Sequence, residues 1–152
     1  MICIACDHGG YELKEHLKAY MEKKGYEVKD LGCDSTAAVD YPVYGQKAGE
    51  CVASGEAELG IIICGTGIGI SIAANKVPGV RATLCMNSTM AALAREHNNA
   101  NILSLGARMI GSVLAEDIVD AFLKTEFSTQ VRHHDRVNLF AEMENKYHSQ
   151  LK

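Results

Sequence analysis

A cysteine followed by glycines at alternate positions is the feature of the sequence that most suggests chemistry. Cys64 ends an apolar run over residues 59–63, and Gly65, Gly67 and Gly69 follow it. Glycines between a strand and a helix let backbone N–H groups converge on an anion. The spacing is that of neither the dinucleotide fingerprint nor the phosphate loop that ends in Lys-Ser/Thr. A thiol beside such donors can act as a base, although a buried structural cysteine is the alternative. We therefore place a candidate catalytic site at Cys64.

His97 has two interpretations. It stands in helical register with Met90, Leu93 and Ala94, which favours a core histidine or a cation at a helix C-terminus. Polar residues also crowd positions 96–101, just before the next expected strand. A histidine there would lie near a sheet edge with hydrogen-bonding neighbours, as acid–base chemistry requires.

Arg132 and Arg136 form a local cationic group in a chain whose net charge is -4. They share one face of an expected helix, and His133 and His134 lie beside Arg132. Such a group suits a phosphate monoester. The alternative is a solvated charged surface, which is the common role of charge runs.

Strand and helix patterns alternate along the whole chain. Short apolar runs predict strands at residues 2–6, 26–31, 59–63, 80–85 and 101–106. Amphipathic stretches predict a helix that stops at Gly25, and others over residues 42–54, 71–76, 88–97, 111–124 and from 131 onward. Ser88 or Thr89 is expected to cap the fourth helix. This alternation predicts a single domain, residues 1–152, folded as a three-layer α/β/α sandwich around a parallel, Rossmann-like sheet.

The expected topology gathers separate residues at one edge of the sheet. Ligands bind such sheets at the carboxyl ends of the strands. Asp7 and His8 follow the first strand, Cys64 ends the central one, and Arg108 follows the fifth. Asp7 is also a good helix cap, which is compatible with facing a ligand. A carboxylate, an imidazole, a thiol and a cation are therefore expected to meet there.

Composition limits the partners and the cellular setting. The net charge of -4 and the pI near 5.8 predict no nucleic-acid or membrane partner. No apolar run reaches the roughly 20 residues of a membrane helix. The six cysteines follow the apolar pattern, and Cys3 and Cys6 should point to opposite faces of their strand. We therefore expect reduced, buried thiols in a cytoplasmic protein.

The last expected helix carries an apolar stripe although the sheet is already covered. The stripe consists of Val137, Phe140, Met143, Tyr147 and Leu151. A sandwich with both faces covered has little room for another amphipathic helix, so this stripe is expected to pack partly on a second subunit.

Four motifs occur in order along the chain: Asp7-His8-Gly9-Gly10, Asp40-Tyr41-Pro42, the stretch from Cys64 to Lys76, and Arg95-Glu96-His97-Asn98 followed by Ala100-Asn101. Together they resemble the family of ribose-5-phosphate isomerase of the B type, which also holds allose- and galactose-6-phosphate isomerases. The resemblance runs from Met1 to about Glu144. It implies the strand order 2-1-3-5-4 and a homodimer with shared active sites, or a dimer of such dimers.

The resemblance also implies a role for each matching residue. Cys64 would be the base that moves a proton between C1 and C2 of a phosphorylated sugar, and His97 would open the sugar ring. Backbone donors would hold the enediolate oxygen, and these belong to Gly65, Thr66, Gly67, Ile68 and Gly69, continuing towards Ser71. Substrate hydroxyls would be ordered by Asp7, Thr66 and Asn98, with Tyr41 also in contact. The phosphate would be bound by His8, Arg108, Arg132 and Arg136. No metal or cofactor is implied, because the glycine loop supplies the electrophilic stabilisation.

The chain departs from the family pattern at both ends of the expected substrate. Thr129-Gln130-Val131 precedes Arg132 where the family often has Gly-Gly, and Thr89 stands where many members carry tyrosine. A six-carbon sugar phosphate such as allose 6-phosphate is therefore an alternative substrate, whereas Cys64 and Glu96-His97 argue against the galactose-6-phosphate branch. A non-catalytic sugar-phosphate or nucleotide-binding module and a thiol-redox protein are alternatives of other classes.

Overall fold

A parallel sheet forms the centre of the molecule. The computed structural model describes the backbone of residues 1–150 and the side chains of residues 1–147. In this part of the chain the sheet has five strands in the order β2-β1-β3-β5-β4, namely β1 (Ile2–Cys6), β2 (Val28–Asp30), β3 (Leu59–Cys64), β4 (Ala82–Leu84) and β5 (Ile102–Gly106). Every neighbouring pair is parallel. The predicted fold and strand order are confirmed.

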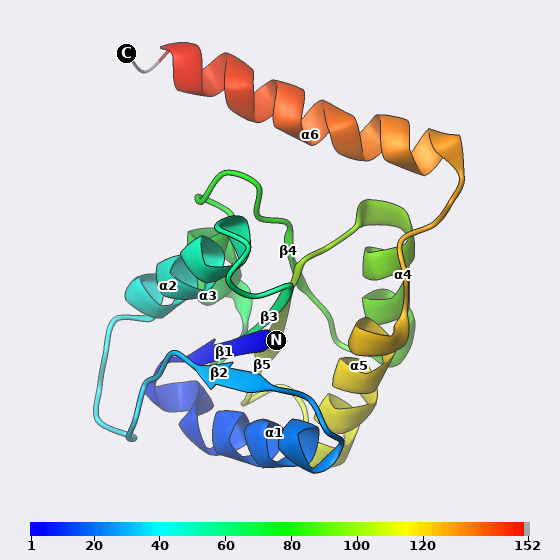
Figure 1. The fold of residues 1–152 in the computed structure, drawn as a ribbon. Helices are drawn as coiled ribbons and strands as arrows, with labels where there is room; N and C mark the ends of the chain where they lie inside the picture. Colours follow the sequence, from blue (N-terminus) through cyan, green and yellow to red (C-terminus); the bar gives the residue numbers. More distant parts are fainter. Residues whose placement is uncertain (151–152) are drawn as a thin grey trace.

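Helices cover both faces of this sheet (Figure 1). The core on one face takes side chains from α1 (Tyr11–Lys23), α4 (Ser88–Asn98) and α5 (Ser112–Lys124). The core on the other face takes side chains from α2 (Tyr41–Ala53) and α3 (Ile68–Ala74). A single 3₁₀ turn, η1 (His8–Gly10), joins β1 to α1. No helix within the described residues is both long and apolar enough to cross a membrane.

Successive side chains of the central strands enter opposite cores, because side chains alternate along a strand. On β3, Ile61 and Ile63 join the α1 and α5 side, whereas Ile62 and Cys64 join the α2 and α3 side. β1 divides its cysteines in the same way, with Cys6 in the first core and Cys3 in the second. All six cysteines are buried and free of disulfides, as expected.

Helix α3 begins three residues earlier than the sequence predicts, at Ile68 in place of Ser71. Gly67 adopts a left-handed conformation with φ of 77° and serves as the N-cap, so the loop is already finished at that residue. Gly69 therefore lies inside the helix. The alternating glycines had favoured a longer loop.

Two expectations for α4 are wrong. Its N-cap is Asn87, whose side-chain oxygen accepts a hydrogen bond from Met90 N at 2.9 Å, and neither Ser88 nor Thr89 fills this role. The residues that α4 buries are Ala91 and Ala94, whereas Met90 and Leu93 are exposed. The expected inward stripe is thus largely an outward apolar surface on the single chain.

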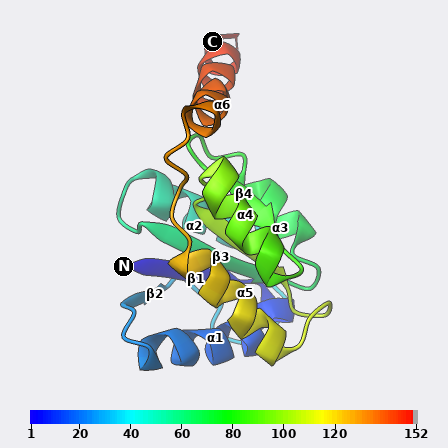
Figure 2. The ribbon, with the colours of Figure 1, turned by 90° about the vertical axis from the view of Figure 1, so that its right-hand side faces the viewer.

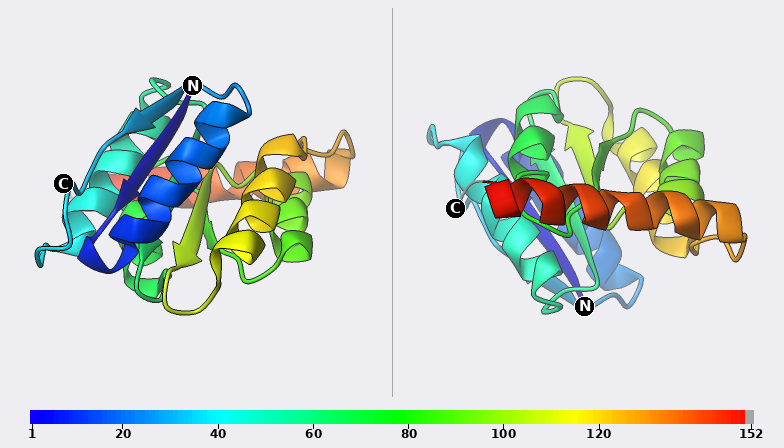
Figure 3. Two further views of the ribbon diagram at one scale, coloured as in Figure 1. Left: turned by 90° about the horizontal axis from the view of Figure 1, so that it is seen from below. Right: turned by 90° about the horizontal axis from the view of Figure 1, so that it is seen from above.

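Helix α6 (Val131–Gln150) lies outside the three layers. Figure 2 shows it end-on above the body, and the right panel of Figure 3 shows it crossing from the α4 side towards α2 and α3. One attachment is the Glu144 carboxylate, which accepts hydrogen bonds from Gly79 N at 3.0 Å with each oxygen. The predicted start at Val131 is confirmed. Of the predicted stripe, Phe140, Met143 and Tyr147 are exposed and Val137 is half-buried, whereas Leu151 lies outside the described residues.

Candidate active site

The carboxyl ends of three strands meet at Cys64. Asp7 N donates to Ile63 O at 3.1 Å, and Ala107 N donates to Cys64 O at 2.9 Å. The residues that follow β1 and β5 are therefore held on either side of the end of β3. This is the edge of the sheet where the sequence predicts the site.

The Cys64 thiol receives a backbone donor. Gly67 N donates to Cys64 Sγ at 3.1 Å, and the residue is 5% exposed. The thiolate is the form of cysteine that acts as a base. Among the other thiols, burial, and then the neighbouring Cys51, raise the pKa of Cys3 to about 12. Cys3 is thus an inert core thiol.

The glycine loop is locked against β4 and β5. Ser104 Oγ donates to Gly67 O at 2.6 Å. A Cβ at Gly67 would lie 2.6 Å from Leu84 Cδ1 and 2.8 Å from the carbonyl carbon of Leu105. Only glycine can come this close to Leu84 and the Leu105 backbone. This packing holds in place the Gly67 N–H that points at Cys64.

Arg108 and Asp7 flank the loop. Arg108 N donates to Gly65 O at 2.9 Å, and the Arg108 guanidinium lies 3.3 Å from the position a Cβ would take on Gly65. Asp7 Oδ1 accepts from Gly9 N at 2.9 Å and from Gly10 N at 3.1 Å, so the predicted cap is formed. A Cβ on Gly9 would lie 3.4 Å from Gly65 N, which places this turn directly beside the loop.

The remaining residues expected near the thiol are also at this edge. His8 Nδ1 accepts from Val39 N at 3.2 Å, so the proton of the neutral ring lies on Nε2. The ring of Tyr41 packs over Gly69, where a Cβ would lie 2.7 Å from it. We call these residues the thiol cluster; its members are Asp7, His8, Tyr41, Gly65, Thr66, Gly67, Ile68, Gly69, Ser71, Arg108 and Cys64. A hollow of about 450 Å³ lies beside it and is lined in part by His8, Gly9 and Ala107.

Two hydroxyls of the thiol cluster are engaged locally. Thr66 is exposed and its Oγ1 accepts from Ile68 N at 3.3 Å. Ser71 is buried and its Oγ donates to Ile68 O at 2.8 Å. Thr66 can therefore turn towards a ligand, whereas Ser71 supports the first turn of α3.

A second cluster lies where α4 ends and α6 begins. The rings of His97 and His133 pack with their centroids 4.5 Å apart, and Arg132 Nε lies 3.5 Å from His133 Nε2. Arg136 is one turn further along α6. We call His97, Arg132, His133 and Arg136 the histidine cluster. The sequence placed His133 only beside Arg132, although it also lies four residues before Val137 on the apolar stripe, a signal of burial.

His134 does not belong to the histidine cluster. Its Nε2 lies 2.7 Å from Ser128 O, and its ring packs on Phe127 at a centroid distance of 4.3 Å. The predicted run of four basic side chains is therefore divided, because successive helical residues face different directions.

The two clusters lie at opposite ends of the strands, the thiol cluster at the carboxyl ends and the histidine cluster towards the amino ends. Helix α4 follows β4 and precedes the parallel strand β5, so it runs back from the carboxyl edge to the amino edge. Its 11 residues end at Asn98, and at about 1.5 Å per residue they carry His97 well away from the edge that holds Cys64. No hydrogen bond, ion pair or ring contact joins the two clusters within the described residues.

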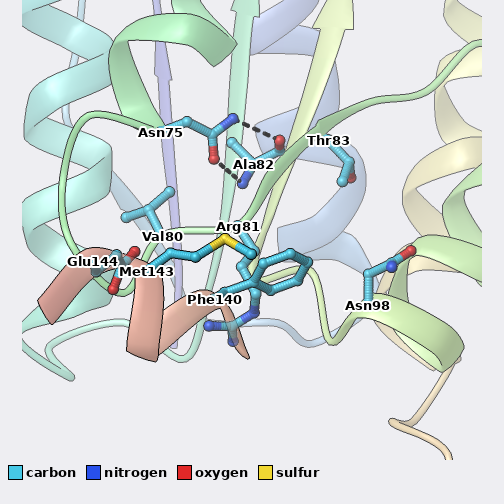
Figure 4. Close-up of a pocket in the computed structure, with 9 residues that line it drawn as sticks. All are labelled: Asn75, Val80, Arg81, Ala82, Thr83, Asn98, Phe140, Met143 and Glu144. Carbon is cyan, nitrogen blue, oxygen red and sulfur yellow. Dashed lines mark hydrogen bonds between the residues drawn. The ribbon is translucent and has the colours of Figure 1, made fainter. Parts of the chain in front are cut away.

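An apolar groove lies beside the histidine cluster. Figure 4 shows Phe140 and Met143 of α6 extending over Val80, Arg81 and Ala82, around a hollow of about 380 Å³. A second hollow of about 310 Å³ lies between β4 and α4, and Met90 and Leu93 are among its lining residues. Thr83 and Asn98 line both hollows. Asn98, which is expected to contact the substrate, therefore lies where the two hollows meet.

A family model described as ribose/galactose isomerase matches residues 2–140. The chain belongs to this family. Over 145 residues it is 43% identical to ribose-5-phosphate isomerase B of Escherichia coli (strain K12), covering 95% of this chain and 97% of that protein. It is 44% identical over 127 residues to galactose-6-phosphate isomerase subunit LacB of Clostridium acetobutylicum, covering 84% of this chain and 73% of that protein. The chain is thus a sugar-phosphate isomerase.

Solved structures of family members have the same fold. Ribose-5-phosphate isomerase B of Clostridium thermocellum is 56% identical and superposes with a TM-score of 0.94, covering 96% of this chain and 98% of that one. The enzyme of Mycoplasma genitalium, solved with bound ribulose 5-phosphate, is 40% identical with a TM-score of 0.89, covering 95% of each chain.

Proposed function

We propose that this sugar-phosphate isomerase interconverts ribose 5-phosphate and ribulose 5-phosphate, with Cys64 as the base. The observation that carries the proposal is the Cys64 sulfur, held at a strand end with Gly67 N 3.1 Å away. The Arg108 guanidinium lies against the same loop. The E. coli and C. thermocellum relatives named above, which bear the name ribose-5-phosphate isomerase B, support this choice of substrate.

The reaction needs a base on one side of the sugar and donors on the other. The Cys64 thiolate removes the proton from C2 of the open-chain aldose, and the electron pair forms a cis-enediolate whose negative charge lies on O1. The O2 proton moves to O1, and the same thiol returns its proton to C1, which leaves the ketose. Preorganised N–H groups of the glycine loop and the first turn of α3, between Gly65 and Gly69, stabilise the oxyanion. This chemistry requires no metal.

The rest of the thiol cluster binds the substrate. His8 and Arg108 contact the phosphate, and Asp7, Thr66 and Tyr41 order the sugar hydroxyls. Arginine suits a phosphate because its planar donors form paired hydrogen bonds with the oxygens. His97 opens the furanose ring before proton transfer, and Asn98 assists in holding the open chain.

Two chains build each site under this proposal. His97 and Asn98 lie at the far end of α4 from Cys64, and Arg132 and Arg136 lie with them. A second chain with its histidine cluster against the first chain's thiol cluster would complete the set. The apolar surface of Met90, Leu93, Phe140 and Met143 is exposed on the single chain, as an interface requires.

Allose 6-phosphate is a second candidate substrate. Thr89 is exposed at the start of α4, where many family members carry a tyrosine, and its smaller side chain would suit a longer sugar. The 44% identity to the LacB subunit is as high as that to the E. coli enzyme, so overall identity does not decide the sugar.

Turnover of ribose 5-phosphate and allose 6-phosphate, measured in parallel with EDTA present, tests the proposal. We expect faster turnover of ribose 5-phosphate. Cys64→Ala should lower kcat by about a thousandfold, the usual loss for a missing base. The control is Cys3→Ala, which removes a core thiol and should leave kcat unchanged while lowering the free energy of unfolding by about 1 kcal/mol. A Cys64→Ala enzyme within about tenfold of the wild type would place the base elsewhere.

A further inference from the structure

His133 is a buried histidine that the proposed reaction does not use. It is 5% exposed, although it lies on α6 between the exposed residues Arg132 and His134. Its ring packs against His97 with the ring planes tilted by 42°. Its Nδ1 is buried and has no hydrogen-bond partner within the described residues. A buried polar atom without a partner costs free energy, so a plain packing role is better served by an apolar ring.

The hydrogen-bond pattern at His133 defines its protonation state. Arg132 Nε donates towards His133 Nε2 at 3.5 Å, so Nε2 is the acceptor and the ring proton lies on Nδ1. Burial lowers the pKa of His133, and the neighbouring His97, Arg132 and Arg136 lower it further, against the carboxylate of Glu96. The ring is therefore neutral at pH 7 and can accept from a guanidinium.

We propose that His133 is a positioning residue that holds the His97 ring and the Arg132 guanidinium in a fixed relative orientation. One flat side of the ring supports His97, and the Nε2 lone pair directs Arg132. The inference rests on the proposed function, in which His97 opens the sugar ring and Arg132 binds the phosphate at the other end of the same substrate. A fixed spacing between them selects a sugar phosphate of matching length.

Two substitutions separate the two contacts. His133→Phe keeps an aromatic ring against His97 but removes the acceptor for Arg132. His133→Gln keeps an acceptor near the position of Nε2 but removes the ring. His134→Phe is the matched control, because it makes the same change at the next residue, which faces Ser128 and Phe127.

The experiment measures kcat and KM with ribose 5-phosphate for the wild type and each variant, with thermal unfolding as the check on folding. We expect His133→Phe to raise KM at least about tenfold and to keep kcat within about twofold, the effect of one lost hydrogen bond to a charged group. We expect His133→Gln to lower kcat about tenfold and to keep KM within about twofold, because His97 loses its support. His134→Phe should change neither constant.

Double variants show whether His133 acts through its neighbours. In an Arg132→Ala background, His133→Phe should raise KM no further, and in a His97→Asn background, His133→Gln should lower kcat no further. Effects that multiply in both backgrounds, or equal losses in kcat and KM for both variants, would overturn the proposal. If one single variant does not fold, the other decides, because the two are expected to change different constants. A wild type inactive on both sugar phosphates would overturn the proposed function itself, and this inference with it.

Discussion

Gly67 shows how much one residue decides at this site. Its φ of 77° and its contact with Leu84 and the Leu105 backbone both require a residue without Cβ. We predict that Gly67→Ala lowers kcat by at least about a hundredfold, because the N–H that faces Cys64 must shift. It should also lower the free energy of unfolding by more than about 2 kcal/mol, since strain and overlap add.

Two other glycines separate these causes. Gly79 also has a positive φ, of 82°, but nothing lies within 4 Å of its added Cβ, so Gly79→Ala should cost only the strain, about 1 kcal/mol. Gly111 has neither constraint but is the N-cap of α5, so Gly111→Ala should cost only the poorer cap, less than about 1 kcal/mol. Denaturant unfolding of the three variants gives the ranking. Equal losses for Gly67→Ala and Gly79→Ala would mean that the close approach to Leu84 has no energetic weight.

Among single residues, the sequence predicted those whose role depends on the residue types next to them. Cys64, its glycines and the Asp7 cap were predictable, because strand ends and caps are set by neighbouring residue types. Asn87 was missed as a cap because Asn, Ser and Thr occur together there and all three can fill the position. The burial of His133 was missed although its position four residues before Val137 is a local signal, because its packing against His97 also depends on the path of residues 125–130.

Among the elements, α1 is attached to β2 by a buried ion pair. The Lys14 ammonium is fully buried and lies 2.7 Å from Asp30 Oδ2, and Lys18 reaches the same oxygen at 3.0 Å. Partial burial raises the pKa of Asp30, but hydrogen bonds from Lys14, Gly32 N and Lys18 outweigh it, and the pKa is lowered overall. The ionised carboxylate therefore stabilises the folded chain.

The sign of this shift predicts an acid-sensitive fold. Because the folded pKa of Asp30 is below its unfolded value of about 3.9, its contribution is present above pH 4 and is lost as the pH falls through the folded pKa. We predict that the free energy of unfolding declines below about pH 4, and that Asp30→Asn both flattens this decline and lowers stability at pH 7 by about 1–3 kcal/mol. Denaturant titrations at several pH values measure both. If the free energy of unfolding fell with pH in the same way for both proteins, the ionisation of Asp30 would not contribute to the decline.

Helix α6 gives a prediction of the opposite kind, in which function is lost and the core remains. Among the side chains that the structure describes, none from α6 belongs to either hydrophobic core. A chain that ends at Gln130 should keep the circular dichroism spectrum of an α/β fold but should be inactive and monomeric or aggregated, because Arg132 and Arg136 are lost with the apolar stripe. Sedimentation and turnover check this. An active truncated monomer would refute the shared site.

The exposed apolar side chains of α4 were predicted wrongly because the sequence does not show what covers them. The apolar periodicity of Met90 and Leu93 indicates a surface that avoids water, but it does not say whether a neighbouring helix or another molecule covers it. The start of α3 was misplaced for a different reason. Glycines are rare inside helices, so Gly69 favoured loop, although its packing under Tyr41 makes glycine necessary there.

For the whole molecule, the proposed division of the site between the two ends of the strands predicts complementation. Cys64→Ala and Arg136→Ala chains should each be inactive alone. After subunit exchange, half of the dimers combine both chains and hold one intact site, so about a quarter of wild-type activity should return. Turnover after mixing, with exchange confirmed by mass spectrometry, is the measurement.

The control pairs two residues of the same cluster. Cys64→Ala mixed with Arg108→Ala should recover nothing, because each mixed dimer then has one altered residue in each thiol cluster. Recovery in the control, or none in the first mixture, would contradict a site built from two chains.

The order of the strands was predicted from the resemblance to the family. Alternation of strands and helices predicts a parallel sheet but does not say which strands are neighbours.

The apolar surface of the single chain also affects which methionines are open to oxidation. It is rich in thioethers, with Met86, Met90 and Met143 all exposed, whereas Met21 is enclosed in the core. Peroxide adds oxygen to an accessible methionine sulfur and turns an apolar side chain into a polar one. If two chains build each site as proposed, oxidative damage would accumulate on unpaired chains first, sparing the fold while making the proposed pairing surface polar.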